Sequence, residues 1–485
     1  EKLMFAFKTK PYEHQKDILE KTWDRSAYAL FLEMGTGKSK VAIDTAAMLF
    51  HKNWVNAVFI VAPKGVYDNW VQKEIPAHLP DEIPRTVVRW QPNFTKTFLK
   101  DLDKIIGPDR KEEEICFFVM NVEALSTPKG MTFASNFLRK NPKNLMIVDE
   151  STTIKNRKAQ RTKNIVKAGR LAKYKRILTG SPITKSPMDL FSQCLFLSPK
   201  ALNFENYYAF QGRYAVIVNR KLGHRQFQDI VGYRRLDELN EKLERFSSRV
   251  LKEDCLDLPP KIYLRREVLL TDEQEKAYVQ MKKLALAQLD TGELASTASV
   301  LTQIMRLQQI VSGFLRLDDG QLRELKSNRI GELMDVIDES QGKIIIWATW
   351  TADIKRIMAE LSKKFGEDSC AAYFGETLQE ERQRIVERFQ DPSSPLRFFV
   401  GQPKTGGYGI TLTEAKNVVY YSNSYDLEIR LQSEDRAHRI GQESKVTYID
   451  MVSPKTIDEK VLQALKDKVN IAEKVLGEEA RGWFS

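Results

Sequence analysis

A glycine-rich loop near the start of the chain has the residue types and spacing that phosphate binding requires. It lies between an apolar run, AYALFLEM, and a helical pattern, KVAIDTAAMLF. Its glycines let backbone N–H groups approach phosphate oxygens, its lysine adds positive charge at the β- and γ-phosphates, and its serine hydroxyl can bind Mg²⁺. Leu32 stands where the general pattern has its first glycine. The residues predicted to bind a nucleoside triphosphate here are Met34, Gly35, Thr36, Gly37, Lys38 and Ser39.

Two carboxylates, Asp149 and Glu150, end the apolar run LMIVDE about 110 residues after the loop. An aspartate at the end of a strand can hold Mg²⁺, usually through water, and the next carboxylate can polarise an attacking water. We therefore predict Asp149 and Ser39 as metal ligands. Lys38, Asp149 and Glu150 are predicted catalytic residues.

Two arginines in the late segment DRAHRIGQ, Arg436 and Arg439, are three residues apart, which places them on one side of a helical turn. Such a pair supplies the cations that a γ-phosphate needs during its transfer, so both are predicted catalytic residues. The alternative is a pair of surface cations neutralised by Glu434 and Asp435. His438 has no other histidine or cysteine near it in sequence, which favours a structural or coupling role over metal binding.

The elements that must position these residues follow a repeated pattern. Short apolar runs (AVFIVAP, ICFFVMN, LMIVDE, KRILTGSP) alternate with amphipathic stretches, and a second set begins near residue 343 (KIIIWAT, RFFVGQ, NVVYYSN, VTYIDMV). This alternation predicts two parallel sheets covered by helices, with ligands at the carboxyl ends of the strands. Gly409, in the segment KTGGYGITL after RFFVGQ, permits close backbone approach to a phosphate or to a neighbouring loop.

The region between the two sets is charged and mostly helical, as in DELNEKLERFSSR and TDEQEKAYVQMKKLALAQL. The predicted fold class is therefore α/β, with two parallel-sheet lobes and a mainly helical insertion between them. The predicted division of the chain is 1–200, 201–325 and 326–485.

The stretch YAVIVNRKLGHRQFQDIVGY predicts a β-hairpin with a basic tip. The tip carries Arg220, Lys221, His224 and Arg225. Residues 151–176 add ten basic side chains and no acid, a pattern equally typical of a solvated helix face. The hairpin suits either contact with nucleic-acid phosphates or a wedge between strands.

The composition of the chain indicates which kind of partner and which cell compartment to expect. Its 76 Lys and Arg against 65 Asp and Glu give a charge of +11, which points to a polyanionic partner. No apolar run is long enough to cross a bilayer and no signal peptide is visible, so no membrane partner is expected. The four cysteines show no paired spacing, which favours a reducing, intracellular setting.

The segments resemble, in order, those of superfamily-two helicase-like motors, and most closely the Swi/Snf (sucrose non-fermenting) family of DNA-stimulated ATPases. The resemblance rests on KPYEHQKDIL, LEMGTGKS, VAPKGVYDNWVQKE, VDESTTIKN, ILTGSPITKSPMDLFSQCLFLSP, RVLKEDCLDLPPKIYLRREVLLTDEQEKAY and GGYGITLTEAKNVVYYSNSYDLEIRLQSEDRAHRIGQ. It implies RecA-like lobes, ATP and Mg²⁺ as cofactors, and adenine recognition by Gln15. It also implies that Gly409 belongs to the ATP site, with Arg436 and Arg439 as arginine fingers.

The resemblance further implies contacts of both lobes with DNA, mainly through phosphates. The residues implied are those near Lys64 and Asn121 in the first lobe and near Gly375 and Thr405 in the second, beside Arg220, Lys221 and Arg225 of the hairpin. A minimal motor of this kind fits a bacterial or viral protein, and we expect a monomer in a bacterial or phage-infected cell.

Three residues depart from the pattern of the family. Thr152 replaces its usual histidine, Thr411 its usual asparagine and Ser181 its usual threonine. Each keeps a small polar group, while the phosphate loop, the acid pair and both arginines are intact. Thr152 puts in doubt how the acidic segment senses closure on DNA.

Four functions fit these observations. The first is a motor that moves along double-stranded or branched DNA, remodelling it or displacing bound proteins. The second is a strand-separating helicase that uses the basic hairpin as a wedge. The third is an accessory motor that recycles another machine, such as RNA polymerase, and the fourth is a nucleotide-gated switch without turnover. Glu150 and the two arginines argue against the switch.

Overall fold

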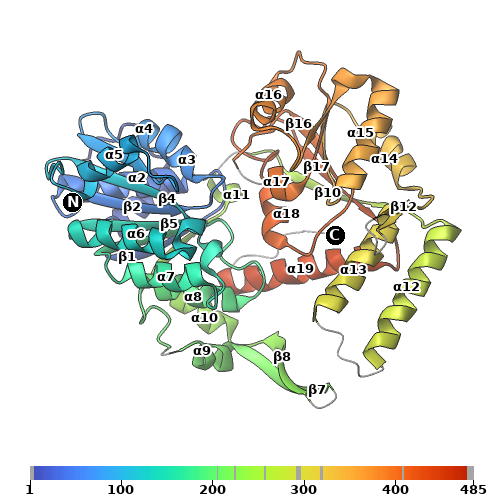
Figure 1. Cartoon of the computed structure of the whole chain (residues 1–485), viewed down its shortest axis with the longest axis horizontal. Helices are drawn as coiled ribbons and strands as arrows, with labels where there is room; N and C mark the ends of the chain where they lie inside the picture. The colour runs from blue at the N-terminus through green and yellow to red at the C-terminus, as the bar shows by residue number, and fades with distance from the viewer. Residues whose placement is uncertain are drawn as a thin grey trace. The chain divides into compact units, whose positions relative to one another are not determined.

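The computed structural model describes residues 5–204, 206–222, 225–255, 258–290, 297–316, 321–406 and 409–477. Two compact units make up the chain. Unit 1 is built from Glu1–Val216 and Val231–Asp257 with the end of the last helix, and unit 2 mainly from Leu258–Asn470. Figure 1 shows both units, each with a sheet and its own covering helices.

Unit 1 contains a seven-stranded sheet in the order β3-β4-β2-β5-β6-β1-β9, in which all neighbouring strands are parallel. Its strands are β1 (Ala27–Leu32), β2 (Ala57–Ala62), β3 (Arg85–Arg89), β4 (Ile115–Asn121), β5 (Asn144–Asp149), β6 (Tyr174–Leu178) and β9 (Ser247–Val250). Its helices are α1 (Glu13–Thr22), α2 (Lys38–His51), α3 (Tyr67–Asn69), α4 (Ile75–His78), α5 (Lys96–Ile106), α6 (Pro128–Lys140), α7 (Gln160–Gly169), α8 (Leu190–Leu197), α9 (Tyr207–Tyr214), α10 (Leu236–Glu244) and α11 (Lys252–Cys255).

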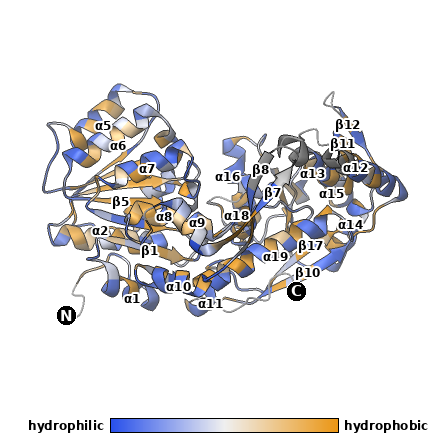
Figure 2. Cartoon of the chain, turned by 90° about the horizontal axis from the view of Figure 1, so that it is seen from below, coloured by the Kyte–Doolittle hydropathy of each residue, from blue (hydrophilic) through white to orange (hydrophobic). Residues whose placement is uncertain are grey.

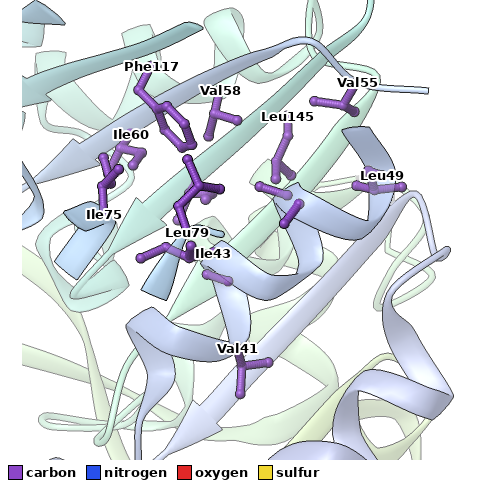
Figure 3. Packing of buried hydrophobic residues seen from close by; sticks show 14 of the residues in the cluster. Val41, Ile43, Leu49, Val55, Val58, Ile60, Ile75, Leu79, Phe117 and Leu145 are labelled. Carbon is purple, nitrogen blue, oxygen red and sulfur yellow. The ribbon is translucent and has the colours of Figure 1, made fainter. Parts of the chain in front are cut away.

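Both faces of the central strands of unit 1 are buried. Along β2, Val58 and Ile60 pack in one apolar cluster with residues of α2, as Figure 3 shows. The intervening Phe59 faces the other side, where its ring lies 6.0 Å from that of Phe137 on α6. A strand buried on both faces needs apolar residues at successive positions, which explains the uninterrupted run AVFIVA.

Unit 2 contains a six-stranded sheet in the order β10-β17-β16-β13-β15-β14, again with every neighbouring pair parallel. Its strands are β10 (Lys261–Glu267), β13 (Lys343–Trp347), β14 (Cys370–Tyr373), β15 (Phe398–Gly401), β16 (Ala415–Tyr420) and β17 (Val446–Val452), beside a small β11 (Phe314–Arg316) and β12 (Leu322–Glu324) pair. Its helices are α12 (Asp272–Asp290), α13 (Thr297–Ser312), α14 (Arg329–Glu339), α15 (Thr351–Phe365), α16 (Gln379–Gln390), α17 (Pro403–Gly406), α18 (Leu427–Glu434) and α19 (Ile457–Leu476).

Residues of β13 alternate between two apolar clusters. Ile344 and Ile346 pack in the cluster that includes α14 and α15, whereas Ile345 and Trp347 pack in the cluster that includes α16. This alternation follows from the two-residue period of a strand and fixes one helical layer on each face of the sheet. Figure 2 shows the apolar strands inside and hydrophilic residues on the outer helix surfaces.

The predicted α/β class with two parallel sheets is confirmed. The region 201–325 holds α12 as predicted, and α10 over the first part of the predicted helical stretch DELNEKLERFSSR, whose last three residues belong instead to β9. The region also supplies edge strands to both sheets, β9 to the first and β10 to the second. These strands, SSRV and KIYLRRE, are rich in polar and charged residues, so they lack the apolar run that identified the central strands. The division at residues 200 and 325 stays a prediction.

The expected hairpin is present as an antiparallel pair, β7 (Ala215–Leu222) and β8 (Arg225–Tyr233), in a sheet of its own. Within the described ranges, no helix combines the length and the apolar character needed to span a membrane.

Candidate active site

The phosphate loop connects β1 to the amino end of α2 and needs glycine at two positions. Gly35 and Gly37 have φ angles of +82° and +87°, in the left-handed region that glycine adopts without strain. A Cβ on Gly37 would also lie 2.1 Å from Nε2 of Gln15. The loop therefore has the backbone freedom and the place at a helix amino end that suit an anion.

Gln15, predicted to recognise adenine, is buried against this loop. Its Nε2 donates to the carbonyl of Thr36 over 3.0 Å, and its Oε1 accepts from the backbone N–H of Tyr12 over 3.0 Å. These bonds fix the amide orientation and tie α1 to the loop. The structure thus places Gln15 beside the predicted phosphate site, while adenine contact stays a prediction.

Asp149 ends β5 and is buried among polar partners. Its Oδ2 accepts from the indole N–H of Trp70 over 2.8 Å, and its Oδ1 accepts from the N–H of Glu150 over 2.9 Å. Burial raises the pKa of Asp149 above its ordinary value, while Lys38, Trp70 and the Glu150 N–H act in the opposite direction. A nearby cation would favour the charged carboxylate further.

Glu150 has φ +46° and ψ +63°, a left-handed conformation that is costly for a residue with a Cβ. This conformation ends the strand sharply and turns the chain into the short helical turn Ser151–Ile154. Non-glycine residues held in this region cluster at functional sites because the surrounding structure must over-determine them.

Buried bonds join the acidic segment to the segment that follows β6. The Ser151 hydroxyl lies 2.6 Å from Oε1 of Gln193, and Nε2 of Gln193 donates to the carbonyl of Pro182 over 2.8 Å. Lys155 donates to the Thr184 hydroxyl over 2.7 Å. The two segments therefore form one connected polar structure at the carboxyl edge of the sheet.

The two departures from the family pattern in unit 1, Thr152 and Ser181, lie in these two segments. Thr152 is 2% exposed, and the backbone N–H of Ser181 donates to the Thr179 hydroxyl over 3.1 Å.

The predicted metal ligands suit Mg²⁺ chemically. Each oxygen of the Asp149 carboxylate accepts one of the hydrogen bonds described above and keeps further acceptor capacity. The hydroxyl of Ser39 is the second hard oxygen donor, and Mg²⁺ prefers such donors together with water and phosphate oxygens. No cluster of three or more His, Cys, Asp or Glu side chains suited to a metal occurs in the described ranges. The arrangement therefore suits a Mg²⁺ ion that is bound by a few protein oxygens, with water and nucleotide oxygens as its remaining ligands.

The sequence predicted that Arg436 and Arg439 lie on one side of a helical turn. In the structure α18 ends at Glu434, and both arginines lie in the non-helical turn that follows it. Both nonetheless reach the same atom: their Nη1 groups donate to the carbonyl of Ile410 over 3.0 and 3.4 Å. Asp435 lies 3.5 Å from Nη2 of Arg436, whereas Glu434 pairs with Arg430 and Lys261. Of the alternative, in which Glu434 and Asp435 neutralise two surface cations, only the pairing of Asp435 with Arg436 is observed among the described residues, and Arg436 is buried rather than at the surface. We call residues Asp435–Gln442 the arginine turn.

The glycine-rich segment of unit 2 packs directly against the arginine turn. The N–H of Leu412 donates to the carbonyl of Arg436 over 2.9 Å, and Nε2 of Gln442 donates to the carbonyl of Thr413 over 2.8 Å. Gly409, with φ +76°, precedes this contact and is exposed. Gly409 thus lies directly before Ile410, the residue whose carbonyl accepts from both arginines.

The predicted DNA residues of unit 1 follow neighbouring strands. Asn121 ends β4, paired in register with Ala62 at the end of β2, and exposed Lys64 follows two residues later. Asn121 donates to Glu123 over 3.0 Å. Both residues therefore lie at the carboxyl edge of the sheet.

The same placement recurs in unit 2. Tyr373 and Gly401 end the paired strands β14 and β15, and they are followed by Gly375 and Thr405. Gly375 is exposed, and a Cβ there would meet no atom within 4 Å. Thr405 lies in α17, close to Gly406, which packs on the ring of Trp347.

The hairpin carries one described basic side chain of the predicted set. Arg220 is exposed and pairs across the strands with Asp229, with Nε and Oδ2 3.0 Å apart. The backbones of Lys221 and Arg225 lie in β7 and β8, but their side chains, and all of His224, lie outside the described residues.

This fold and site define a nucleotide-binding protein with two parallel-sheet units, a phosphate loop in one and an arginine turn in the other. Residues 14–313 match the SNF2-related domain, and residues 326–441 match the helicase conserved C-terminal domain. The chain belongs to the SNF2-related family, which confirms the resemblance inferred from the motifs.

Similar proteins include plant and bacterial relatives. One is the probable ATP-dependent DNA helicase CHR12 of Arabidopsis thaliana, 25% identical over 92% of this chain and 39% of the relative. Another is the putative ATP-dependent helicase/translocase YwqA of Bacillus subtilis, 26% identical over 88% of this chain and 44% of the relative. The chain thus spans less than half the length of these relatives.

A solved structure with a similar chain is the Sulfolobus solfataricus SWI2/SNF2 ATPase core in complex with dsDNA. It is 23% identical, covers 98% of this chain and 99% of that chain, and has a TM-score of 0.43.

Several residues of the site were not predicted from the sequence. Trp70 orients Asp149, Gln193 holds Ser151, and Arg249 donates to the carbonyls of Phe31 and Gly180 over 3.0 and 2.8 Å. A buried indole, amide or guanidinium has no periodicity that distinguishes it, so only the fold identifies these partners.

Proposed function

We propose that this chain is a DNA-stimulated ATPase that uses ATP hydrolysis to move along double-stranded DNA, remodelling DNA structures or displacing bound proteins. The observation that carries the ATPase proposal is the carboxylate Asp149, buried and oriented by Trp70, followed by Glu150 in a strained conformation at the same sheet edge as the phosphate loop. Family membership supports the motor.

In this proposal Lys38 and the loop N–H groups bind the phosphates, while Ser39 and Asp149 hold Mg²⁺, which offsets phosphate charge when bound. Glu150 orients and polarises the attacking water. Arg436 and Arg439 release the Ile410 carbonyl and stabilise instead the negative charge that develops on the transferring phosphoryl group. Gln15 recognises adenine. The DNA is contacted mainly through phosphates by the loops of Lys64, Asn121, Gly375 and Thr405.

The ATPase is tested with two variants that differ in the step they block. Lys38→Ala should abolish hydrolysis because it removes the lysine of the phosphate loop, and Glu150→Gln should bind ATP yet lose turnover because only the water-polarising charge is removed. Nucleotide binding is measured with a fluorescent ATP analogue and hydrolysis by phosphate release. Near-normal turnover in folded Lys38→Ala would refute the site.

Movement along duplex is tested separately, with ATPase rates on duplex, single-stranded and forked DNA and on RNA. Displacement of a third strand from a triplex should occur, while release of a strand from a long tailed duplex should not.

Strand separation is the second candidate function, and the hairpin β7–β8 is its motivating feature. Opening a duplex costs about 1.4 kcal/mol per base-pair step, so unwinding requires a rigid element between the strands. The sequence of the tip, NRKLGHR, offers only Leu222 as a bulky apolar residue, which suits phosphate contact better than wedging. Efficient release of the duplex strand, lost on deleting Arg220–Arg225, would establish the helicase instead.

A further inference from the structure

A buried carboxylate, Glu434, stands at the last position of α18, directly before the arginine turn. Its Oε2 accepts from the hydroxyl of Tyr263 over 2.8 Å and lies 3.3 Å from Nζ of Lys261. Its Oε1 accepts from Nε of Arg430 over 2.8 Å, and its backbone carbonyl accepts from the Tyr448 hydroxyl over 2.8 Å. The end of α18 is therefore held by two side chains of β10 as well as by its own helix.

The charges of this cluster are balanced. Arg430 forms two bonds with the Asp450 carboxylate, of 2.6 and 2.9 Å, beside its bond with Glu434. Lys261 supplies the second cation. Burial acts to raise the pKa of Glu434, but Lys261, Arg430 and Tyr263 outweigh it, and the pKa is lowered from its ordinary value. Glu434 is thus a charged group whose geometry depends on β10.

A second contact joins the residues just before β10 to the arginine turn. Nε2 of His438 lies 2.7 Å from the carbonyl of Pro259, and because a carbonyl can only accept, Nε2 carries the proton. His438 lies between Arg436 and Arg439. Pro259–Tyr263 thus contacts Glu434, directly before the arginine turn, and His438, inside the turn.

The segment Pro259–Tyr263 is stiff enough that a movement of its backbone would also move the residues it contacts, Glu434 and His438. Pro259 and Pro260 have φ restricted by their rings, so the segment is stiff. Lys261 and Tyr263 lie on one face of β10, as expected for a strand, and pair in register with β17. The longest span of unit 2 begins at Leu258, directly before this segment.

We infer that Pro259–Tyr263 is a positioning element that sets the arginine turn for phosphoryl transfer, acting through Lys261 and Tyr263 on Glu434 and through Pro259 on His438. This role rests on the proposed ATPase function. A shift of this segment therefore acts on the two arginines through two contacts, one with Glu434 directly before the arginine turn and one with His438 inside it.

The test compares single side chains on β10. Tyr263→Phe removes one hydroxyl without changing the ring, Lys261→Met removes the charge, and Lys261→Arg is the conservative variant. Arg265→Met is the matched control, because Arg265 lies on the same face of the same strand but pairs with Glu459 at the surface. Thermal unfolding confirms that each variant is folded.

We expect Lys261→Met and Tyr263→Phe to lower kcat by about tenfold, with KM for ATP and DNA affinity within about twofold of wild type, because the affected contacts act in the transition state. Lys261→Arg should recover most of the rate, and Arg265→Met should match wild type.

A double-mutant cycle separates positioning from general destabilisation. If Lys261 acts through the arginine turn, Lys261→Met should cost little more in an Arg436→Ala background than Arg436→Ala alone. Equal losses in both backgrounds, or kcat values of Lys261→Met and Tyr263→Phe equal to that of Arg265→Met, would overturn the inference while leaving the ATPase intact. Wild-type hydrolysis that Lys38→Ala does not reduce would instead remove the proposed function on which the inference rests.

Discussion

At the scale of single residues, the candidate site depends on side chains whose orientation is fixed by partners far away in sequence. Asp149 is the clearest case, because the indole N–H of Trp70 holds one oxygen and the backbone N–H of Glu150 holds the other. A carboxylate held in this way presents its remaining lone pairs in fixed directions. Loss of a partner that orients a metal ligand typically costs about 10- to 100-fold in metal affinity or activity.

Trp70→Phe should therefore weaken the response to Mg²⁺. The change removes the indole N–H, and we expect the Mg²⁺ concentration for half-maximal ATPase activity to rise by about tenfold or more. Trp347→Phe is the control, because Trp347 is equally buried and its indole N–H has no hydrogen-bond partner among the described residues. An equal Mg²⁺ response in wild type and Trp70→Phe would contradict the orienting role.

Arg436→Ala and Arg439→Ala should act on the rate of the chemical step. Both guanidinium groups already point to one atom, the Ile410 carbonyl, so both can serve one developing charge. We expect kcat to fall by about a hundredfold or more with little change in nucleotide affinity, since arginine fingers stabilise the transition state. Steady-state kinetics and nucleotide titration check this expectation, and losses confined to KM would argue against it.

At the scale of elements, the amino end of α15 contains a buried carboxyl, Asp353, that the candidate site does not use. Burial raises the pKa of Asp353 to about 7, while Arg329 and Arg356 act in the opposite direction and Asp458 in the same one. Arg329 also pairs with Asp458 and with the Ser453 hydroxyl, 3.2 Å away, so these groups join α14, α15 and the start of α19. The element is therefore sensitive to the ionisation of one side chain.

Asp353→Asn should change how stability depends on pH. The folded-state pKa lies above the ordinary value of 3.8, so the unfolded chain loses this proton first, and the contribution of Asp353 to the stability of the wild type is lost as pH rises from about 4 to about 7. Asparagine cannot ionise, so the melting temperature of the variant relative to wild type should rise across this window and level off above pH 7. A difference in melting temperature that is the same at pH 5 and pH 8 would show that Asp353 does not titrate there.

At the scale of the whole molecule, the net charge of +11 and the loops at the carboxyl edges of both sheets describe a protein suited to a polyanion. Lys64 follows β2 and is exposed at such an edge. Arg220, in contrast, is already paired with Asp229 on the hairpin. Contacts with phosphates carry little sequence information, so DNA binding should depend strongly on salt and weakly on sequence.

Lys64→Ala should reduce the salt dependence of DNA binding. Each phosphate contact contributes about 0.9 to the slope of log affinity against log salt, so the variant should lose about one unit of slope equally on unrelated duplexes. Lys52→Ala is a suitable control, since Lys52 is exposed at the far end of α2 from the phosphate loop. Fluorescence anisotropy over a salt series measures both slopes, and a loss that depends on the duplex sequence would indicate base contacts instead.

The sequence by itself determined the family and the class of fold, and it predicted the residues of the candidate site. The phosphate loop, the acid pair and the arginine pair are local patterns, and strands such as AVFIVA are apolar because both their faces are buried. The tertiary structure alone decided what holds these groups in place. Trp70 meets Asp149 across 79 residues of sequence, and Tyr263 meets Glu434 across 171. A local pattern reports which face of an element is buried, but a single hydrogen bond between distant segments leaves no periodic trace, so only the folded chain identifies it.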